Sequence, residues 1–249
     1  RNHSTLAMGW TLEDALASLA SGTAASIDIL GGLVGDRGAE RLAAALESNS
    51  TVTGVELPFN QIGDEGAERL AAALERNSSV SSLGLGANAI GDRGAERLAE
   101  SLERNITVAG LRLHENGIGA RGAGRLAAAL ERNSTITSIE LHGNAVGAQG
   151  AERLLAALER SGTVTSLGLQ QNGIEARQQE QLEAALRRNR AGVRVLTVRC
   201  SPQGPGRCSV TCSDLEGKEL AALDLGLGET VAALQEALSA RTGHAGHWR

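Results

Sequence analysis

The sequence predicts an α/β solenoid, a right-handed horseshoe with parallel strands on its concave side and helices on its convex side. The first observation behind this prediction is a strict period of 28 residues between five asparagines. They are Asn60, Asn88, Asn116, Asn144 and Asn172. The second observation is that a strand pattern precedes each of these asparagines and a helix pattern follows most of them. A constant period of this length is typical of stacked repeats.

The strand of one repeat shows the expected local structure. It follows the pattern L-x-x-L-x-L-x-x-N, which ends at Asn60. Val55 and Leu57 are two residues apart, so both point to the buried face of the strand, and Glu56 points to the other. An asparagine at the inward turn offers both donors and acceptors to backbone groups that would otherwise be unpaired. We therefore predict a ladder of structural asparagines, one in each repeat.

The helix of the same repeat follows from small and apolar residues. Leu70 and Leu74, with alanines between them, form one apolar stripe. Asp64 precedes this stripe and is predicted to cap the helix by accepting from amides of its first turn. Asp36 and Asp92 hold the same position in neighbouring repeats. Arginine and glutamate columns along these helices indicate a solvated face.

The period fades at the N-terminus. We interpret residues 1–32 as a capping repeat, because Leu12, Leu16 and Leu19 keep a helical spacing but Gly32 replaces the asparagine. A terminal repeat is expected to be atypical, since one of its faces meets solvent.

Repeats of 28 residues are predicted over residues 33–200. After one inserted residue, Val193, Leu196 and Val198 provide the apolar positions of a seventh and last strand. Ser201 then takes the place of the asparagine.

The C-terminal region departs from the repeat pattern. Two prolines and two glycines occur close together, which predicts a linker over residues 201–207. We expect a second folded segment over residues 208–243 and a tail over residues 244–249.

Composition limits the partners and the compartment. The formal net charge of −5 at pH 7 argues against nucleic acid as a partner. No apolar run approaches the roughly 18 residues of a membrane span, so no membrane partner is predicted. The three cysteines, Cys200, Cys208 and Cys212, are sparse and odd in number. This usage favours a reducing compartment, and we predict a cytoplasmic protein.

The triplet Asn-x-Ser/Thr occurs at Asn2 and, at one shared repeat position, at Asn49, Asn77, Asn105 and Asn133. This triplet is the acceptor pattern of N-glycosylation. Because four copies share a repeat position, we interpret them as copies of one loop residue and not as glycosylation sites.

Residues 33–190 resemble leucine-rich repeats of the ribonuclease-inhibitor type. The strands of the pattern above and the helices 35–46, 63–74 and 91–102 carry this resemblance. Similar repeats form the sensing ends of NOD-like receptors, and related repeats occur in a GTPase-activating protein for the Ran GTPase. The resemblance implies a horseshoe fold whose function depends on its variable concave positions.

Residues 208–243 resemble the first half of a ubiquitin-like β-grasp domain. The pattern contains a strand at 208–213, a hairpin turn at 215–218, a returning strand at 220–225 and an amphipathic helix at 229–238.

The outward-facing strand positions and the turns after them change between repeats, and we predict that they bind the partner. They are Glu56, Phe59, Arg112, His114, Glu115, Glu140, His142, Gln170 and Gln171. His114 and His142 are expected side by side on adjacent strands, and with Glu115 and Glu140 nearby they suggest a metal site. We interpret them instead as a variable polar surface and predict no metal and no cofactor. Cys208 and Cys212 with His244 and His247 fall outside the usual zinc-ligand spacings.

We therefore predict a non-catalytic scaffold that binds a protein partner by shape and charge on the concave face. No Ser/His/Asp set, phosphate loop or paired-carboxylate cleft stands out, and we predict that the protein is not an enzyme. The alternatives are a GTPase regulator of the Ran-GAP-like kind and the sensing repeat region of a NOD-like-receptor-type protein.

Overall fold

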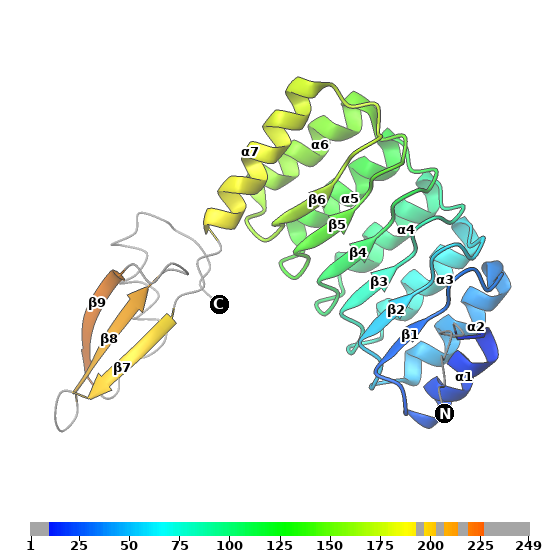
Figure 1. Ribbon diagram of the computed structural model, residues 1–249, viewed down its shortest axis with the longest axis horizontal. Coiled ribbons are helices and arrows are strands. Elements are labelled where there is room, and N and C mark those ends of the chain that lie inside the picture. The colour runs from blue at the N-terminus through cyan, green and yellow to red at the C-terminus, as the bar shows by residue number, and fades with distance from the viewer. Residues whose placement is uncertain (1–9, 193–196, 203–206, 214–218, 227–249) are drawn as a thin grey trace, which may run out of the picture. The chain divides into compact units, whose positions relative to one another are not determined.

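The computed structural model describes residues 10–192, 197–202, 207–213 and 219–226. The chain divides into two compact units, residues 1–190 and 191–249. The first unit alternates helices and strands, and the second holds an antiparallel sheet (Figure 1).

Six short strands of the first unit form one parallel sheet in chain order. They are β1 (Ser26–Asp28), β2 (Gly54–Glu56), β3 (Ser82–Gly84), β4 (Gly110–Arg112), β5 (Ser138–Glu140) and β6 (Ser166–Gly168). Each strand pairs with the next so that residues 28 apart face one another, as Glu56 faces Gly84. Because the register equals the repeat length, every strand position forms a row across the sheet.

Helices cover one face of this sheet (Figure 1). They are α1 (Leu12–Ser21), α2 (Gly35–Ser48), α3 (Asp64–Leu74), α4 (Asp92–Leu102), α5 (Ala120–Arg132), α6 (Gly147–Arg160) and α7 (Ala176–Gly192). Packed helices need about 8–10 Å between axes, whereas strands need about 4.8 Å, so the helical side is convex. The predicted α/β solenoid is confirmed. Among the described residues, no helix combines the length and the apolar character needed to span a bilayer.

The core is a continuous aliphatic layer between sheet and helices. The central residues of successive strands, Val55, Leu83, Leu111 and Ile139, are all buried there. The predicted helix stripe also faces this layer, with Leu70 and Leu74 buried on α3. Burying each of these larger aliphatic side chains stabilises the fold by about 1.5–3 kcal/mol.

The periodic asparagine closes the turn after each strand from β2 to β6. Asn60 is fully buried, and its Oδ1 accepts from the N–H of Gly32 at 2.9 Å. Its Nδ2 donates to the carbonyls of Ile29 at 2.6 Å and Pro58 at 2.9 Å. The other four also donate to a carbonyl of the preceding repeat: Asn88, Asn116, Asn144 and Asn172. These bonds tie each turn to its neighbour.

A second asparagine column lies where the helices end. Its buried members include Asn49, Asn77, Asn105 and Asn133. In Asn77, Oδ1 accepts from the N–H groups of Ser79 and Val80, and Nδ2 donates to the carbonyl of Leu46 at 2.8 Å. The amides of the Asn-x-Ser/Thr triplets in the repeats therefore serve the fold. Sequence reasoning recognised their shared position but not this second ladder.

Three aspartates near helix starts cap the helix of the following repeat. Asp64 Oδ1 accepts from the N–H groups of Gly91 at 2.7 Å and Gly94 at 2.8 Å, where α4 begins. The prediction that Asp64 caps its own helix is therefore wrong, because Gly63 is the N-cap of α3 and makes no side-chain cap bond. Asp36 and Asp92 act in the same way on α3 and α5. The next repeat lies one strand spacing away, within reach of a carboxylate.

A helix that lacks this aspartate starts differently. Ala120 occupies the position that would serve α6. There Gly147 has a φ of 62°, and its N–H donates to the carbonyl of Asn172 at 2.9 Å. Gly35 repeats this arrangement at α2 with a φ of 56° and the carbonyl of Asn60. Glycine suits both positions, because it adopts positive φ without steric cost.

The second unit contains β7 (Thr197–Pro202), β8 (Arg207–Ser213) and β9 (Glu219–Gly226) in an antiparallel sheet. Val198 faces Cys212 on β8, so the prediction of a seventh strand in the parallel sheet is wrong. The helix α7 continues to Gly192, through positions that form a loop in the repeat before it. Among the described strands, the parallel sheet contains β1 to β6, and β7 belongs to the sheet of the second unit. The division between the units falls after Arg190.

The predicted C-terminal segments are partly described. β8 and β9 pair as an antiparallel hairpin, as expected for residues 208–213 and 220–225. Parts of the predicted linker, Ser201, Pro202 and Arg207, belong to strands. The helix predicted at residues 229–238 lies outside the described residues. The ubiquitin-like resemblance stays a prediction, and β7 adds a strand that it did not contain.

Candidate interaction surface on the concave sheet

Two rows of outward-facing residues cross the sheet. The first row contains the last residue of each strand: Asp28, Glu56, Gly84, Arg112, Glu140 and Gly168. The second row lies two residues later: Leu30, Pro58, Gly86, His114, His142 and Gln170. We call one group in and beside these rows the concave cluster: Glu56, Ser82, Arg112, His114, Glu140 and His142.

Arg112 lies at the centre of the concave cluster. Its Nη1 donates to the carboxylate of Glu56, two strands away, and to Ser82 Oγ at 3.2 Å. Its Nε lies 3.7 Å from Glu140 Oε1. One arginine therefore links carboxylates from β2 and β5. The three charged side chains are partly exposed, so water still reaches the network.

Two glycines provide the space for this arrangement. A Cβ at Gly84 would lie 1.7 Å from Glu56 Oε2, and a Cβ at Gly86 would lie 2.2 Å from ring atoms of His114. Neither glycine has a positive φ, so close approach is what excludes a side chain there. Glu56 and His114 lie over β3 because that strand presents no side chain at these two positions.

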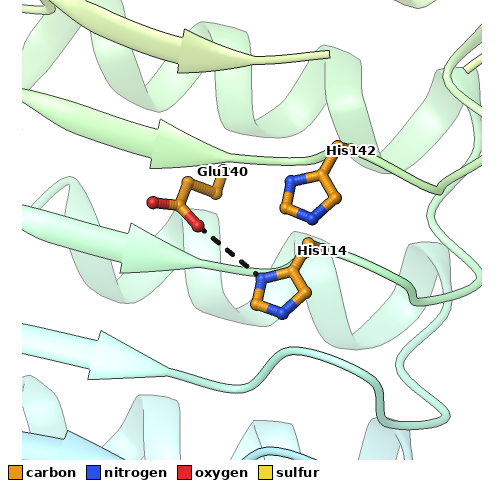
Figure 2. A group of neighbouring side chains, drawn as sticks. All are labelled: His114, Glu140 and His142. Atoms are coloured by element: carbon orange, nitrogen blue, oxygen red, sulfur yellow. Dashed lines mark ion pairs between the residues drawn. The ribbon is translucent and has the colours of Figure 1, made fainter. Parts of the chain in front are cut away.

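The two histidines stack. Their ring centroids are 4.5 Å apart and their planes differ by 6°, close to the spacing of neighbouring strands. Figure 2 shows the carboxylate of Glu140 beside the rings, with Oε2 3.8 Å from His114 Nδ1. His114 Nδ1 is buried and has no hydrogen-bond partner among the described residues.

The remaining predicted site residues lie outside the concave cluster. Phe59, Glu115 and Gln171 follow the second row at a turn where φ is 58°, 51° and 58°. This turn needs a left-handed residue in every repeat, and those three side chains are exposed. The group of described residues with metal-ligand geometry contains Glu140 and not Glu115. Gln170 belongs to the second row but is exposed, two residues after β6.

Sequence reasoning named Phe59 but missed two exposed leucines that add to the apolar surface near it. Leu30 and Leu33 are 65% and 69% exposed, and Phe59 is 56% exposed. The N–H of Gly31 donates to the carbonyl of Pro58 at 3.1 Å, which places the two turns side by side. The sequence did contain a signal for this, because the register places Leu30 in the outward-facing second row, where its side chain cannot enter the core.

The convex surface carries ion pairs between successive repeats. Arg76 lies 2.9 Å from Glu47, and Arg104 lies 2.9 Å from Glu75. A hydrogen bond from Arg97, with Arg125 nearby, lowers the pKa of Glu100. Such exposed pairs contribute about 0–1 kcal/mol each. The helix columns pair as well, with Arg97 Nε 3.6 Å from Glu68 Oε1 and Arg125 Nε 3.1 Å from Glu96 Oε1. They form the solvated helix face that the charge columns predicted.

The repeats match a known family model. Residues 48–71, 76–99 and 132–155 match the Leucine Rich repeat model. These three segments are therefore leucine-rich repeats. The concave cluster lies between β2 and β5, so its members come from successive repeats.

Two solved structures are similar to this chain in backbone arrangement. Leiomodin-1 actin-binding site 2 is 19% identical with a TM-score of 0.49, and the match covers 73% of this chain and 90% of that one. The tropomodulin C-terminal domain of Caenorhabditis elegans is 16% identical with a TM-score of 0.49, covering 73% and 95%. No curated protein sequence matches the chain.

Proposed function

We propose that this protein is a non-catalytic scaffold that binds a protein partner on its concave face. The observation that carries the proposal is the concave cluster itself. Its charged and imidazole side chains point away from the core, whereas the asparagines and aspartates described above bond to the backbone of neighbouring repeats. The structural positions carry the same residue in successive repeats, whereas the positions of the cluster carry side chains that differ from strand to strand.

The surface indicates a partner of particular chemistry. The first row holds three carboxylates, from Asp28, Glu56 and Glu140, against one guanidinium, from Arg112. A partner segment with basic side chains would complement this excess of negative charge. The apolar patch of Leu30, Leu33 and Phe59 offers a contact for an apolar anchor beside it. Protein interfaces combine such a buried apolar contact with a polar surround.

The test compares two double variants with matched charge. The concave variant is Arg112→Gln with Glu140→Gln. The convex control is Arg104→Gln with Glu75→Gln, which removes the same two charge types from an exposed pair. Each protein is used to capture partners from cell extract, and the bound proteins are quantified by mass spectrometry. A true partner binds the wild type and the convex control equally and is reduced at least about 10-fold on the concave variant.

If every captured protein binds the concave variant as well as it binds the wild type, the concave face is not the binding surface.

The ribonuclease-inhibitor-type class and the cytoplasmic location stay predictions. The alternative of GTPase regulation would gain support if the protein stimulated GTP hydrolysis by a Ran-like GTPase, which a pure scaffold does not do.

A further inference from the structure

We propose that His114, Glu140 and His142 form a binding site for a divalent transition-metal ion of the zinc class. These residues come from two adjacent repeats and lie on the exposed face of the sheet (Figure 2). One ligand atom from each lies within 4.8 Å of the others. Imidazole and carboxylate are ligands that zinc takes in proteins, and two histidines with one glutamate is a known ligand set for it.

The repeat register brings the three ligands together. Arg112 faces Glu140 across β4 and β5, and each histidine follows its strand by two residues. His114 and His142 are therefore held at the strand spacing, with rings 4.5 Å apart. Backbone pairing continues beyond the strands here, because the N–H of Glu115 donates to the carbonyl of His142 at 2.7 Å.

The separations are close to what a bound ion needs. Two ligands about 2.1 Å from a tetrahedral ion are about 3.4 Å apart. His114 Nδ1 and Glu140 Oε2 are 3.8 Å apart, which is beyond a hydrogen bond but near that ligand separation. Ligation requires the stacked rings to tilt toward each other. This tilt is a rotation about χ2 of histidine, whose torsional preferences are broad.

One atom in the group lacks a partner. His114 Nδ1 is buried and makes no hydrogen bond within the described part of the chain. Buried polar atoms in folded proteins are nearly always paired, so an exception needs an explanation. A metal ion bound to Nδ1 would supply the missing interaction.

The neighbours of the site support a ligating role for Glu140. Its Oε2 faces His114, while its Oε1 lies 3.7 Å from Arg112 Nε. Outer partners of this kind orient ligating carboxylates. Arg112 also keeps its bond to Glu56, so part of its charge is balanced within the cluster. Gly168 presents no side chain beside His142, which leaves room for water to complete the coordination.

The experiment measures zinc binding to the full chain. Three other histidines and three cysteines are possible competitors, so the reference protein carries replacements at all six: His3→Gln, His244→Gln, His247→Gln, Cys200→Ser, Cys208→Ser and Cys212→Ser. Isothermal titration with Zn²⁺ is expected to show one saturable site per chain. Imidazole resonances of His114 and His142 are expected to shift together in NMR spectra during the titration.

Variants of the reference protein then locate the site. His142→Gln is expected to weaken Zn²⁺ binding at least about 100-fold, and Glu140→Gln at least about 10-fold. Glu115→Gln is the matched control, because Glu115 is a neighbouring carboxylate outside the ligand group. It is expected to change the affinity less than about 3-fold. Circular dichroism checks that each variant stays folded.

The proposal is overturned if the reference protein shows no saturable binding below about 1 mM Zn²⁺. It is also overturned if His142→Gln binds Zn²⁺ as tightly as the reference, or if Glu115→Gln weakens binding as much as Glu140→Gln. None of these outcomes depends on a protein partner. The zinc experiment can therefore refute zinc binding without refuting the proposed scaffold function, and the capture experiment can refute the scaffold function without refuting zinc binding.

Discussion

The asparagine of each inward turn and the residues of the concave cluster are only a few positions apart in sequence, yet they differ in almost every physical respect. Asn60 is buried, and both polar atoms of its side chain are hydrogen-bonded to backbone groups. His114 is partly exposed, and its Nδ1 is unpaired within the described residues. The first kind of position is the same in repeat after repeat, whereas the second changes.

This difference separates structural positions from functional ones. An asparagine at the inward turn satisfies backbone groups that the fold buries, so losing it leaves several groups without partners. A residue of the concave cluster satisfies no buried backbone group. The fold therefore tolerates change there, and binding chemistry is free to vary. The following predictions test this separation, beginning with the largest expected effect on stability.

Replacing a turn asparagine should be the most damaging change. Asn60→Ala leaves the N–H of Gly32 and the carbonyl of Ile29 without their partners. We expect a loss of about 3 kcal/mol in the free energy of unfolding, measured by urea denaturation followed by circular dichroism. The matched control is Gln170→Ala, an exposed amide of the second row, with an expected change within about 0.5 kcal/mol. Similar losses for both variants would contradict the separation.

Removing a shared helix cap should have an intermediate effect. Asp92→Ala removes the acceptor for the N–H groups of Gly119 at 2.8 Å and Gly122 at 2.7 Å. We expect a loss of about 1–2 kcal/mol. In native-state hydrogen exchange, the faster exchange should appear at the start of α5 and not at the start of α4. Faster exchange at α4 would instead indicate that Asp92 caps its own helix.

A change at the centre of the concave cluster should scarcely affect stability. Arg112→Gln breaks the link between Glu56 and Glu140, but all three side chains are partly exposed. We expect a loss of no more than about 1 kcal/mol in the same urea experiment. A loss as large as that of Asn60→Ala would show that the cluster is structural.

The convex ion pairs should contribute least, and with a defined pH dependence. Because Arg97 and Arg125 lower the pKa of Glu100, its ionised form stabilises the folded state. This contribution is present above the unfolded-state pKa of about 4.3 and is lost as pH falls through the lower folded-state pKa. Glu100→Gln should therefore cost under about 0.5 kcal/mol at pH 7. The difference from the wild type should shrink toward zero near pH 3, and a difference that grows on acidification would contradict this assignment.

Features that depend on interactions within one repeat could be predicted from the sequence, whereas contacts between repeats mostly could not. The strands, the helices and the inward asparagines depend on local patterns, and the structure places them at the predicted residues. The last strand was misplaced, because Val198 and its neighbours have a strand pattern that fits either sheet. The pattern of apolar residues does not say which strand is the partner.

The candidate surface was predicted in part. The side-by-side position of His114 and His142 followed from their 28-residue spacing, and the structure brings them into a stack. Both Glu115 and Glu140 were expected near the histidines, but only Glu140 belongs to the ligand group among the described residues. This difference depends on the left-handed turn at Glu115 and on the side-chain positions above the sheet. The role of Gly84 and Gly86 in making room for Glu56 and His114 was likewise invisible in the sequence.

The sequence by itself determined the repeat length, the buried face of each strand and the place of each structural asparagine. These features repeat along the chain and depend on the alternation of side chains within a strand or helix. Only the tertiary structure decided that Asp64 caps the next helix, that Glu56 reaches Arg112 across β3 and that Glu140, not Glu115, joins the two histidines. Each of these contacts joins different repeats, and its partner is set by the distance between neighbouring strands and by the side chains that the intervening strand lacks.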